Sequence, residues 1–137
     1  MATMTSEAID TFLRETRIAK LATLNADGSP NIVPVWFDWE GGVARVFTSK
    51  TSPKIRRIAT DNRVALSVEE GVGAKERWVS IEGSAGVEES GGLALARKLI
   101  DRYYSPERIA ETWPSWEKMG DEWVVIAITP RRIRSEV

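Results

Sequence analysis

The chain has 137 residues, of which 42% are hydrophobic and 28% are charged, and its formal net charge is −1. This composition predicts one globular domain spanning residues 1–137, and a charge balance near zero argues against a general binder of nucleic acids or membrane surfaces. Cysteine and histidine are both absent, which excludes disulfides, thiol catalysis, serine–histidine triads and histidine metal sites.

The remaining side chains include none whose unperturbed pKa lies near neutrality. Any catalysis is therefore expected to use the chemistry of a bound cofactor, and the sequence identifies no catalytic residue and no metal ligand. No apolar run approaches the length of a membrane span, and the N-terminus shows no signal-peptide core. These features predict a cytoplasmic protein without a membrane segment.

The N-terminal half predicts a helix followed by three strands. After a loose tail at residues 1–5, Ile9, Phe12 and Leu13 share one helical face. Pro34 in the second strand implies an edge position, because proline has no backbone N–H to donate. The elements expected here are a helix at 6–16, strands at 18–24, 31–37 and 43–48, a hairpin turn at 25–30 and a turn at 38–42.

The C-terminal half predicts three helices and three further strands. One short helix begins where Ser52 can act as N-cap and Pro53 can take the first helical position. The last strand is expected to stop at Pro130. The other elements expected are strands at 64–69, 77–88 and 123–129, a loop at 70–75, a helix beginning at Ser90, and a shorter helix at 106–119.

Together these elements predict a mainly β fold with peripheral helices. About six strands joined mostly by hairpins form an antiparallel sheet, and in a chain of this size such a sheet is expected to close as a small barrel. A doubly wound α/β fold is disfavoured, because strands and helices do not alternate regularly.

A cluster of cations marks the segment around the short helix. Residues 50–63 carry five positive charges against the single acid Asp61. Helix N-termini present unpaired N–H groups and partial positive charge, and Lys50 and Lys54 bracket this one. The segment therefore predicts a phosphate cradle, with Arg56 and Arg57 able to hold a second anionic group. A solvated basic face remains the alternative, and nucleic-acid binding is the weaker third possibility because no aromatic residues are interleaved.

The order of these segments resembles a known family. The sequence NIVPVWF from Asn31, the segment FTSKTSPK from Phe47, the helix end DNRVAL from Asp61 and the strand RWVSIEG from Arg77 are similar to the pyridoxamine 5'-phosphate oxidase-like split barrel. This superfamily includes oxidoreductases that depend on the deazaflavin F420. The resemblance implies a six-stranded antiparallel split barrel that forms a homodimer with cofactors at the subunit interface.

The resemblance also implies which residues contact the cofactor. The strand Val33, Pro34, Val35 and Trp36 would lie along the tricyclic ring. Beyond it, the ribityl chain and phosphate would meet a group of polar side chains, and the long strand would approach the cofactor separately. These further residues are Thr48, Ser49 and Lys50 along the ribityl chain, Ser52 and Lys54 at the phosphate, and Arg77 and Trp78 on the long strand.

Three positions depart from the pyridoxamine 5'-phosphate oxidase pattern. Asn31, Trp36 and Pro53 stand where the oxidases have arginine, lysine and arginine, and the histidine expected for their substrate has no counterpart. The oxidase activity itself is therefore not expected. The cofactor expected is F420 or FMN, with F420 favoured because Arg56 and Arg57 add charge for its long anionic tail.

Under this interpretation the protein is an oxidoreductase. It would orient a reduced ring against a small planar conjugated substrate, to which hydride passes. The pocket walls would be aromatic, and Tyr103 or Tyr104 could donate a proton. Two alternatives remain open: a carrier that binds a flavin or another planar ligand without catalysis, and a dimeric structural module without a ligand. The tryptophans expected at the pocket are Trp36, Trp78 and either Trp113 or Trp116.

Overall fold

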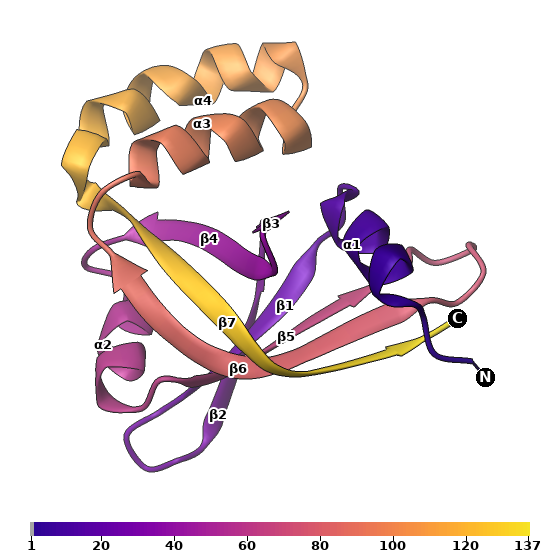
Figure 1. The fold of residues 1–137 in the computed structure, drawn as a ribbon. Coiled ribbons are helices and arrows are strands. Elements are labelled where there is room, and N and C mark those ends of the chain that lie inside the picture. Colours follow the sequence, from indigo (N-terminus) through magenta and orange to yellow (C-terminus); the bar gives the residue numbers. More distant parts are fainter. Residues whose placement is uncertain (1) are drawn as a thin grey trace.

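The computed structural model describes residues 2–137 and shows one seven-stranded antiparallel sheet with four α-helices around it. The helices cover the sheet at three places (Figure 1): α3 and α4 lie together over one end, while α1 and α2 lie apart. The helices are α1 (Ser6–Arg14), α2 (Pro53–Thr60), α3 (Gly92–Tyr103) and α4 (Pro106–Met119), followed by a 3-10 turn η1 (Gly120–Glu122).

The strands run in the order β2-β1-β5-β6-β7-β4-β3 across the sheet. Within the described residues the two outer strands do not pair with each other, so the curled sheet is a split barrel, as predicted. The strands are β1 (Ala19–Leu24), β2 (Pro30–Val35), β3 (Asp38–Glu40), β4 (Val43–Ser49), β5 (Arg63–Glu69), β6 (Trp78–Glu88) and β7 (Trp123–Glu136).

The prediction of six strands was wrong by one, because the segment read as a turn contains β3. Asp38 pairs with Arg45 and Glu40 with Val43, so only Gly41 and Gly42 form the turn. Both glycines have positive φ angles, of 59° and 75°, as a two-residue hairpin turn between twisted strands requires.

The predicted end of the last strand at Pro130 was also wrong, because β7 continues to Glu136. Pro130 lies opposite Gly83, where the pairing of β6 with β7 shifts register. This irregularity accommodates a residue that cannot donate to a regular ladder. A Cβ on Gly83 would lie 2.2 Å from the carbonyl oxygen of Thr129, so glycine also permits the close approach of the two strands.

Local signals placed the starts of α2 and α4 correctly. Ser52 Oγ accepts a hydrogen bond from the Lys54 backbone N–H at 3.3 Å, and Ser105 Oγ accepts one from the Arg108 N–H at 3.3 Å. Each serine precedes a proline in the first helical position, as expected for such caps. Helix α4 is longer than α3, contrary to the prediction.

The chain ends lie beside each other. Of the tail predicted at residues 1–5, residue 1 lies outside the described residues. Ala2 accepts a backbone hydrogen bond from Val137 at 2.9 Å, and the Met4 N–H donates to Ser135 Oγ at 2.9 Å.

Two apolar layers fill the fold. The larger core lies inside the curled sheet and includes Phe12, Phe37 and Ile81, all at most 1% exposed. The smaller cluster lies between α3 and the outer face of β4 and β7, where Leu95, Leu99 and Val125 are buried beside Trp36 and Phe47. The second layer positions the candidate site, because its aromatic side chains continue into a cleft.

Candidate functional site

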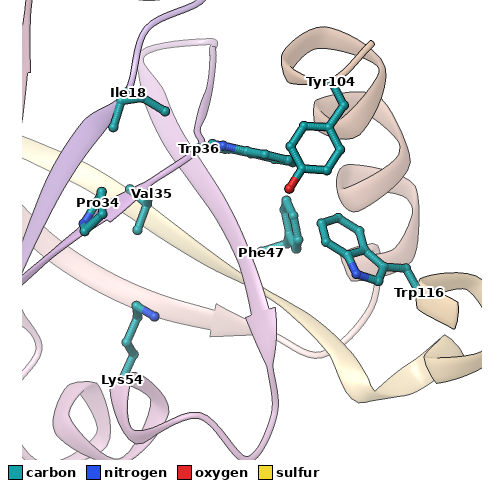
Figure 2. Close-up of a pocket in the computed structure, with 8 residues that line it drawn as sticks. All are labelled: Ile18, Pro34, Val35, Trp36, Phe47, Lys54, Tyr104 and Trp116. Atoms are coloured by element: carbon teal, nitrogen blue, oxygen red, sulfur yellow. The ribbon is translucent and has the colours of Figure 1, made fainter. Parts of the chain in front are cut away.

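A cleft of about 390 Å³ opens between β2, β4 and the helical layer. Figure 2 shows its lining, with Lys54 entering from α2 and the aromatic side chains from another side. No carboxylate is among the lining residues, which are Ile18, Pro34, Val35, Trp36, Phe47, Lys54, Tyr104 and Trp116. Apart from the cation of Lys54, the lining is apolar and aromatic. Such a surface suits a planar ligand that carries an anionic group.

The wall on one side is a connected aromatic cluster. Trp36 stacks on Tyr103 with ring centroids 4.8 Å apart and planes 5° apart. Tyr104 meets the edge of Trp36 at 4.8 Å, and Trp116 lies 6.0 Å from Trp36 and 5.6 Å from Phe47. Each ring is thus held by at least one other ring, which fixes the shape of this wall.

Tyr103 stacks on Trp36 without lining the cleft, and so fixes the orientation of the Trp36 ring. Its hydroxyl donates to the carbonyl oxygen of Arg17 at 2.6 Å, and burial raises its pKa. Because the hydroxyl is already bonded to the backbone and the ring does not line the cleft, Tyr103 acts in the structure as a support for Trp36. Tyr104, which does line the cleft, is the tyrosine placed to meet a ligand.

Lys54 supplies the only positive charge among the residues that line this cleft. Its side chain is half-buried, and within residues 2–137 no carboxylate oxygen lies within 4.0 Å of its ammonium group. Burial, together with the nearby charge of Arg57, lowers its pKa. An anionic ligand beside Lys54 would offset both effects, since it favours the charged form of the lysine.

Four of the predicted cofactor contacts meet in this cleft: Pro34, Val35, Trp36 and Lys54. Tyr104, considered as a proton donor, and Trp116, considered as a pocket wall, also line it. Strand β2 carries Pro34 and Val35, and Trp36 follows it directly. This strand is at the edge of the sheet, so one row of its backbone groups has no strand partner within the described residues. The edge position expected from Pro34 is therefore confirmed. Val33 lies on the same strand but does not line the cleft.

The hydroxyl and cationic residues near α2 have other contacts in the structure. Ser49 Oγ lies 3.0 Å from Thr51 Oγ1, Thr48 is buried, and the Lys50 N–H donates to the carbonyl oxygen of Glu122 at 2.8 Å. Arg57 Nε donates to Asn25 Oδ1 at 2.9 Å, and Arg56 is exposed to solvent. Their contact with a cofactor stays a prediction, as does that of Ser52.

Arg77 and Trp78 do not line the cleft. Arg77 Nη2 donates to a carboxylate oxygen of Glu70 at 2.5 Å, and Arg17 Nε donates to the other oxygen at 2.8 Å. Both guanidinium groups also lie over the Phe12 ring, at 3.8 Å for Arg17 and 5.1 Å for Arg77. Trp78 pairs with Glu69 at the start of β6. The role of Arg77 and Trp78 at a cofactor stays a prediction.

We expect the Glu70 cluster to make stability depend on acid pH. Hydrogen bonds from Arg17 and then Arg77 lower the pKa of Glu70 from 4.5 to about 2. A carboxylate with a depressed pKa contributes stability that is complete above pH 4.5 and is lost as the pH falls through about 2. Glu70→Gln should therefore unfold at a lower urea concentration than wild type at pH 7. The difference between the two urea midpoints should become smaller as the pH falls from 4.5 to 2. Glu69→Gln is the control for loss of one exposed carboxylate, and an unchanged midpoint in Glu70→Gln at pH 7 would contradict the expectation.

Two residues that line the cleft, Ile18 and Phe47, were not identified from the sequence. Phe47 lies on the same face of its strand as Arg45 and Ser49. An aromatic residue on this otherwise polar face could have indicated that the outer side of the strand is covered by another element. Either Trp113 or Trp116 was expected at the pocket, and it is Trp116 that lines the cleft. Trp113 does not line it and lies 5.0 Å from the Arg97 guanidinium.

Neither a metal site nor a membrane helix is found in the part of the chain that the structure describes. Residues 2–137 contain no cluster of three or more acidic side chains placed to bind a metal ion. None of the described helices combines the length and apolar character that crossing a membrane requires.

Comparison with known sequences identifies a family over almost the whole chain. Residues 5–136 match the family described as pyridoxamine 5'-phosphate oxidase. An F420H(2)-dependent biliverdin reductase from Mycobacterium tuberculosis is 40% identical over 78 residues, which are 56% of this chain and 54% of that protein. The matched segment thus spans about half the length of this curated relative.

Comparison with solved structures gives the same fold. The conserved hypothetical protein Rv2991 from Mycobacterium tuberculosis superposes with a TM-score of 0.76 at 29% identity, covering 96% of this chain and 84% of that one. A structure named F420 reductase superposes with a TM-score of 0.73 at 26% identity, covering 90% of this chain and 94% of that one.

Proposed function

Because this chain belongs to the pyridoxamine 5'-phosphate oxidase family, we propose that it binds a flavin-type coenzyme, F420 or FMN, and acts as an oxidoreductase on a small planar conjugated substrate. F420 is the favoured coenzyme. Two of the similar proteins are named for dependence on F420 or for its reduction, one of them at 40% identity over 78 residues. The oxidase activity that gives the family its name is not proposed, because the chain has no histidine and has Asn31 and Trp36 in place of the expected cations.

The observation that carries the proposal is the half-buried Lys54 ammonium facing an uncharged cleft. A partly buried cation without a carboxylate partner has lost some of its hydration, and a bound anion would offset that loss. The residues present fit the coenzyme: Lys54 can bind its anionic chain, while the edge strand β2 and Trp36 offer a flat wall to its ring. When bound, the coenzyme supplies the hydride chemistry, and the protein orients the ring and excludes water.

We expect Lys54→Ala to weaken coenzyme binding by about 1.5–3 kcal/mol, the usual contribution of a hydrogen bond to a charged group. Fluorescence-quenching titrations of the purified protein with F420 and, separately, with FMN measure this and identify the coenzyme. Lys75→Ala is the matched control, because Lys75 is exposed in the loop before β6 and does not line the cleft. Equal affinity of Lys54→Ala and the control for both coenzymes would remove Lys54 from the site.

We also propose that the working unit is a homodimer with the coenzyme at the subunit interface. The cleft lies beside the edge strand β2, and Ile18 and Ile32 near this edge of the sheet are 43% and 64% exposed. Apolar side chains exposed beside a binding cleft are suited to contact a second subunit. Sedimentation of the purified chain as a monomer at micromolar concentration with bound coenzyme would contradict this arrangement.

The second candidate is a protein that carries the coenzyme without catalysis. The scarcity of proton donors among the residues that line the cleft favours this candidate. Tyr104 is the only lining side chain besides Lys54 that could donate a proton, and no histidine exists in the chain. A reduced bound coenzyme that a panel of planar acceptors fails to oxidise, with retained tight binding, would support the carrier and contradict the enzyme.

A further inference from the structure

A second cation, Arg108 on the first turn of α4, does not itself line the cleft but contacts Tyr104, which does. Its backbone N–H is fixed by the Ser105 cap at 3.3 Å. Its guanidinium carbon lies 3.8 Å from the centre of the Tyr104 ring, and Nη2 donates to the Tyr104 hydroxyl at 2.9 Å. Figure 2 shows that hydroxyl directed toward the other aromatic side chains of the cleft.

Arg108 is positioned without a carboxylate partner. Within residues 2–137 no acidic side chain lies within 4.0 Å of its guanidinium, although Glu107 and Glu111 are its neighbours on the same helix. A guanidinium has five N–H donors, and Tyr104 takes one of them. The stacking and the hydrogen bond hold the group in place before a ligand arrives, which reduces the entropic cost of binding an anion there.

The two ends of the cleft differ in what they can bind. On the proposed function, on which this inference rests, the coenzyme occupies the Lys54 end beside β2. The remaining surface is the aromatic corner of Trp36, Tyr104 and Trp116, and the Arg108 guanidinium is held beside it by Tyr104. Such a corner fits a flat conjugated molecule, and the neighbouring guanidinium is matched to the two oxygens of a carboxylate.

We infer that Arg108, oriented by Tyr104, selects substrates that join a planar conjugated system to a carboxylate. It is a specificity residue for the acceptor and takes no part in holding the coenzyme. The neutral amide of the same acceptor fills the aromatic corner equally well but lacks the charge, so with the coenzyme bound at Lys54 the two molecules should be distinguished by Arg108.

The test is calorimetric binding of trans-cinnamate and of its neutral analogue trans-cinnamamide, to protein with and without bound F420. We expect wild type to favour the acid, and Arg108→Gln to weaken acid binding about 10- to 100-fold with little effect on the amide. Arg108→Lys should recover part of the loss, since it restores charge without the planar fork. Arg97→Gln is the control, because Arg97 is paired with Asp101 away from the cleft.

The outcomes separate this inference from the proposed function. Loss of acid preference in Arg108→Gln with normal F420 binding supports both. An Arg108-dependent preference for the acid in a protein that binds neither F420 nor FMN supports a carboxylate site and overturns the coenzyme proposal. Equal binding of acid and amide by wild type, or binding of neither, overturns the inference whatever the coenzyme does.

Discussion

Gly92→Ala is expected to destabilise the protein by about 3 kcal/mol, as overpacking of a tight contact does. A Cβ at Gly92 would lie 2.2 Å from the carbonyl oxygen of Trp123, 2.3 Å from its carbonyl carbon and 2.6 Å from the backbone nitrogen of Val124. All three are backbone atoms at the start of β7, so no side-chain rotation can relieve the clash. The start of α3 must instead move away from the sheet. Urea unfolding measures the loss as a lower midpoint with an unchanged slope.

Gly86→Ala is the matched control for this prediction. Gly86 is exposed on β6, its φ angle is not positive, and a Cβ there would meet nothing within 4 Å. We expect that variant to stay within about 0.5 kcal/mol of wild type. Because α3 ends at Tyr103, which stacks on Trp36, Gly92→Ala should also weaken coenzyme binding. A Gly92→Ala variant as stable as Gly86→Ala would contradict the close approach of α3 to β7.

The features predictable from sequence are those encoded by neighbouring residues. The Ser52–Pro53 cap and the edge position of Pro34 each depend on a few adjacent residues, and the structure confirms both. The split barrel followed from the order of such elements together with the family resemblance, and it is also confirmed.

The features that sequence analysis missed depend on contacts between distant segments. Pro130 ends a strand by local rules, yet β7 continues because Gly83 on β6 accommodates the irregular pairing. Similarly, the helix predicted to begin at Ser90 begins at Gly92, with Gly91 as the N-cap at a φ of 90°, because only a glycine at 92 fits against Trp123. Neither partner can be identified without knowing which strands and helices lie side by side.

The candidate site shows the same division. Lys54 and Trp36 were predicted from the local pattern and the resemblance, and both line the cleft. Arg77 was predicted on the same basis, but its guanidinium donates to Glu70, seven residues earlier and across a loop. Arg108 was not singled out, since its importance depends on the absence of a partner and on a ring at position 104, which only the three-dimensional arrangement reveals.

Trp36→Ala is expected to have the largest combined effect on stability and binding. Trp36 stacks on Tyr103 and contacts Phe47, Tyr104 and Trp116, so its removal leaves four rings without their shared neighbour. For a half-buried tryptophan we expect a loss of about 2–4 kcal/mol in unfolding free energy, from lost burial and ring contacts. The flat wall beside β2 disappears with it, and coenzyme affinity should fall by about tenfold or more. Urea unfolding and fluorescence titration measure the two effects on the same preparation.

Two variants distinguish the role of this wall from a general cost of losing a tryptophan. Trp113→Ala removes a half-buried tryptophan that contacts Arg97 outside the cleft, so it should leave coenzyme affinity unchanged and cost about 1 kcal/mol or less. Trp36→Phe keeps an aromatic face toward Tyr103 and should recover most of the stability and part of the binding. If Trp36→Ala bound the coenzyme as tightly as Trp113→Ala does, the ring could not lie against Trp36, and the cleft beside β2 would not be the coenzyme site.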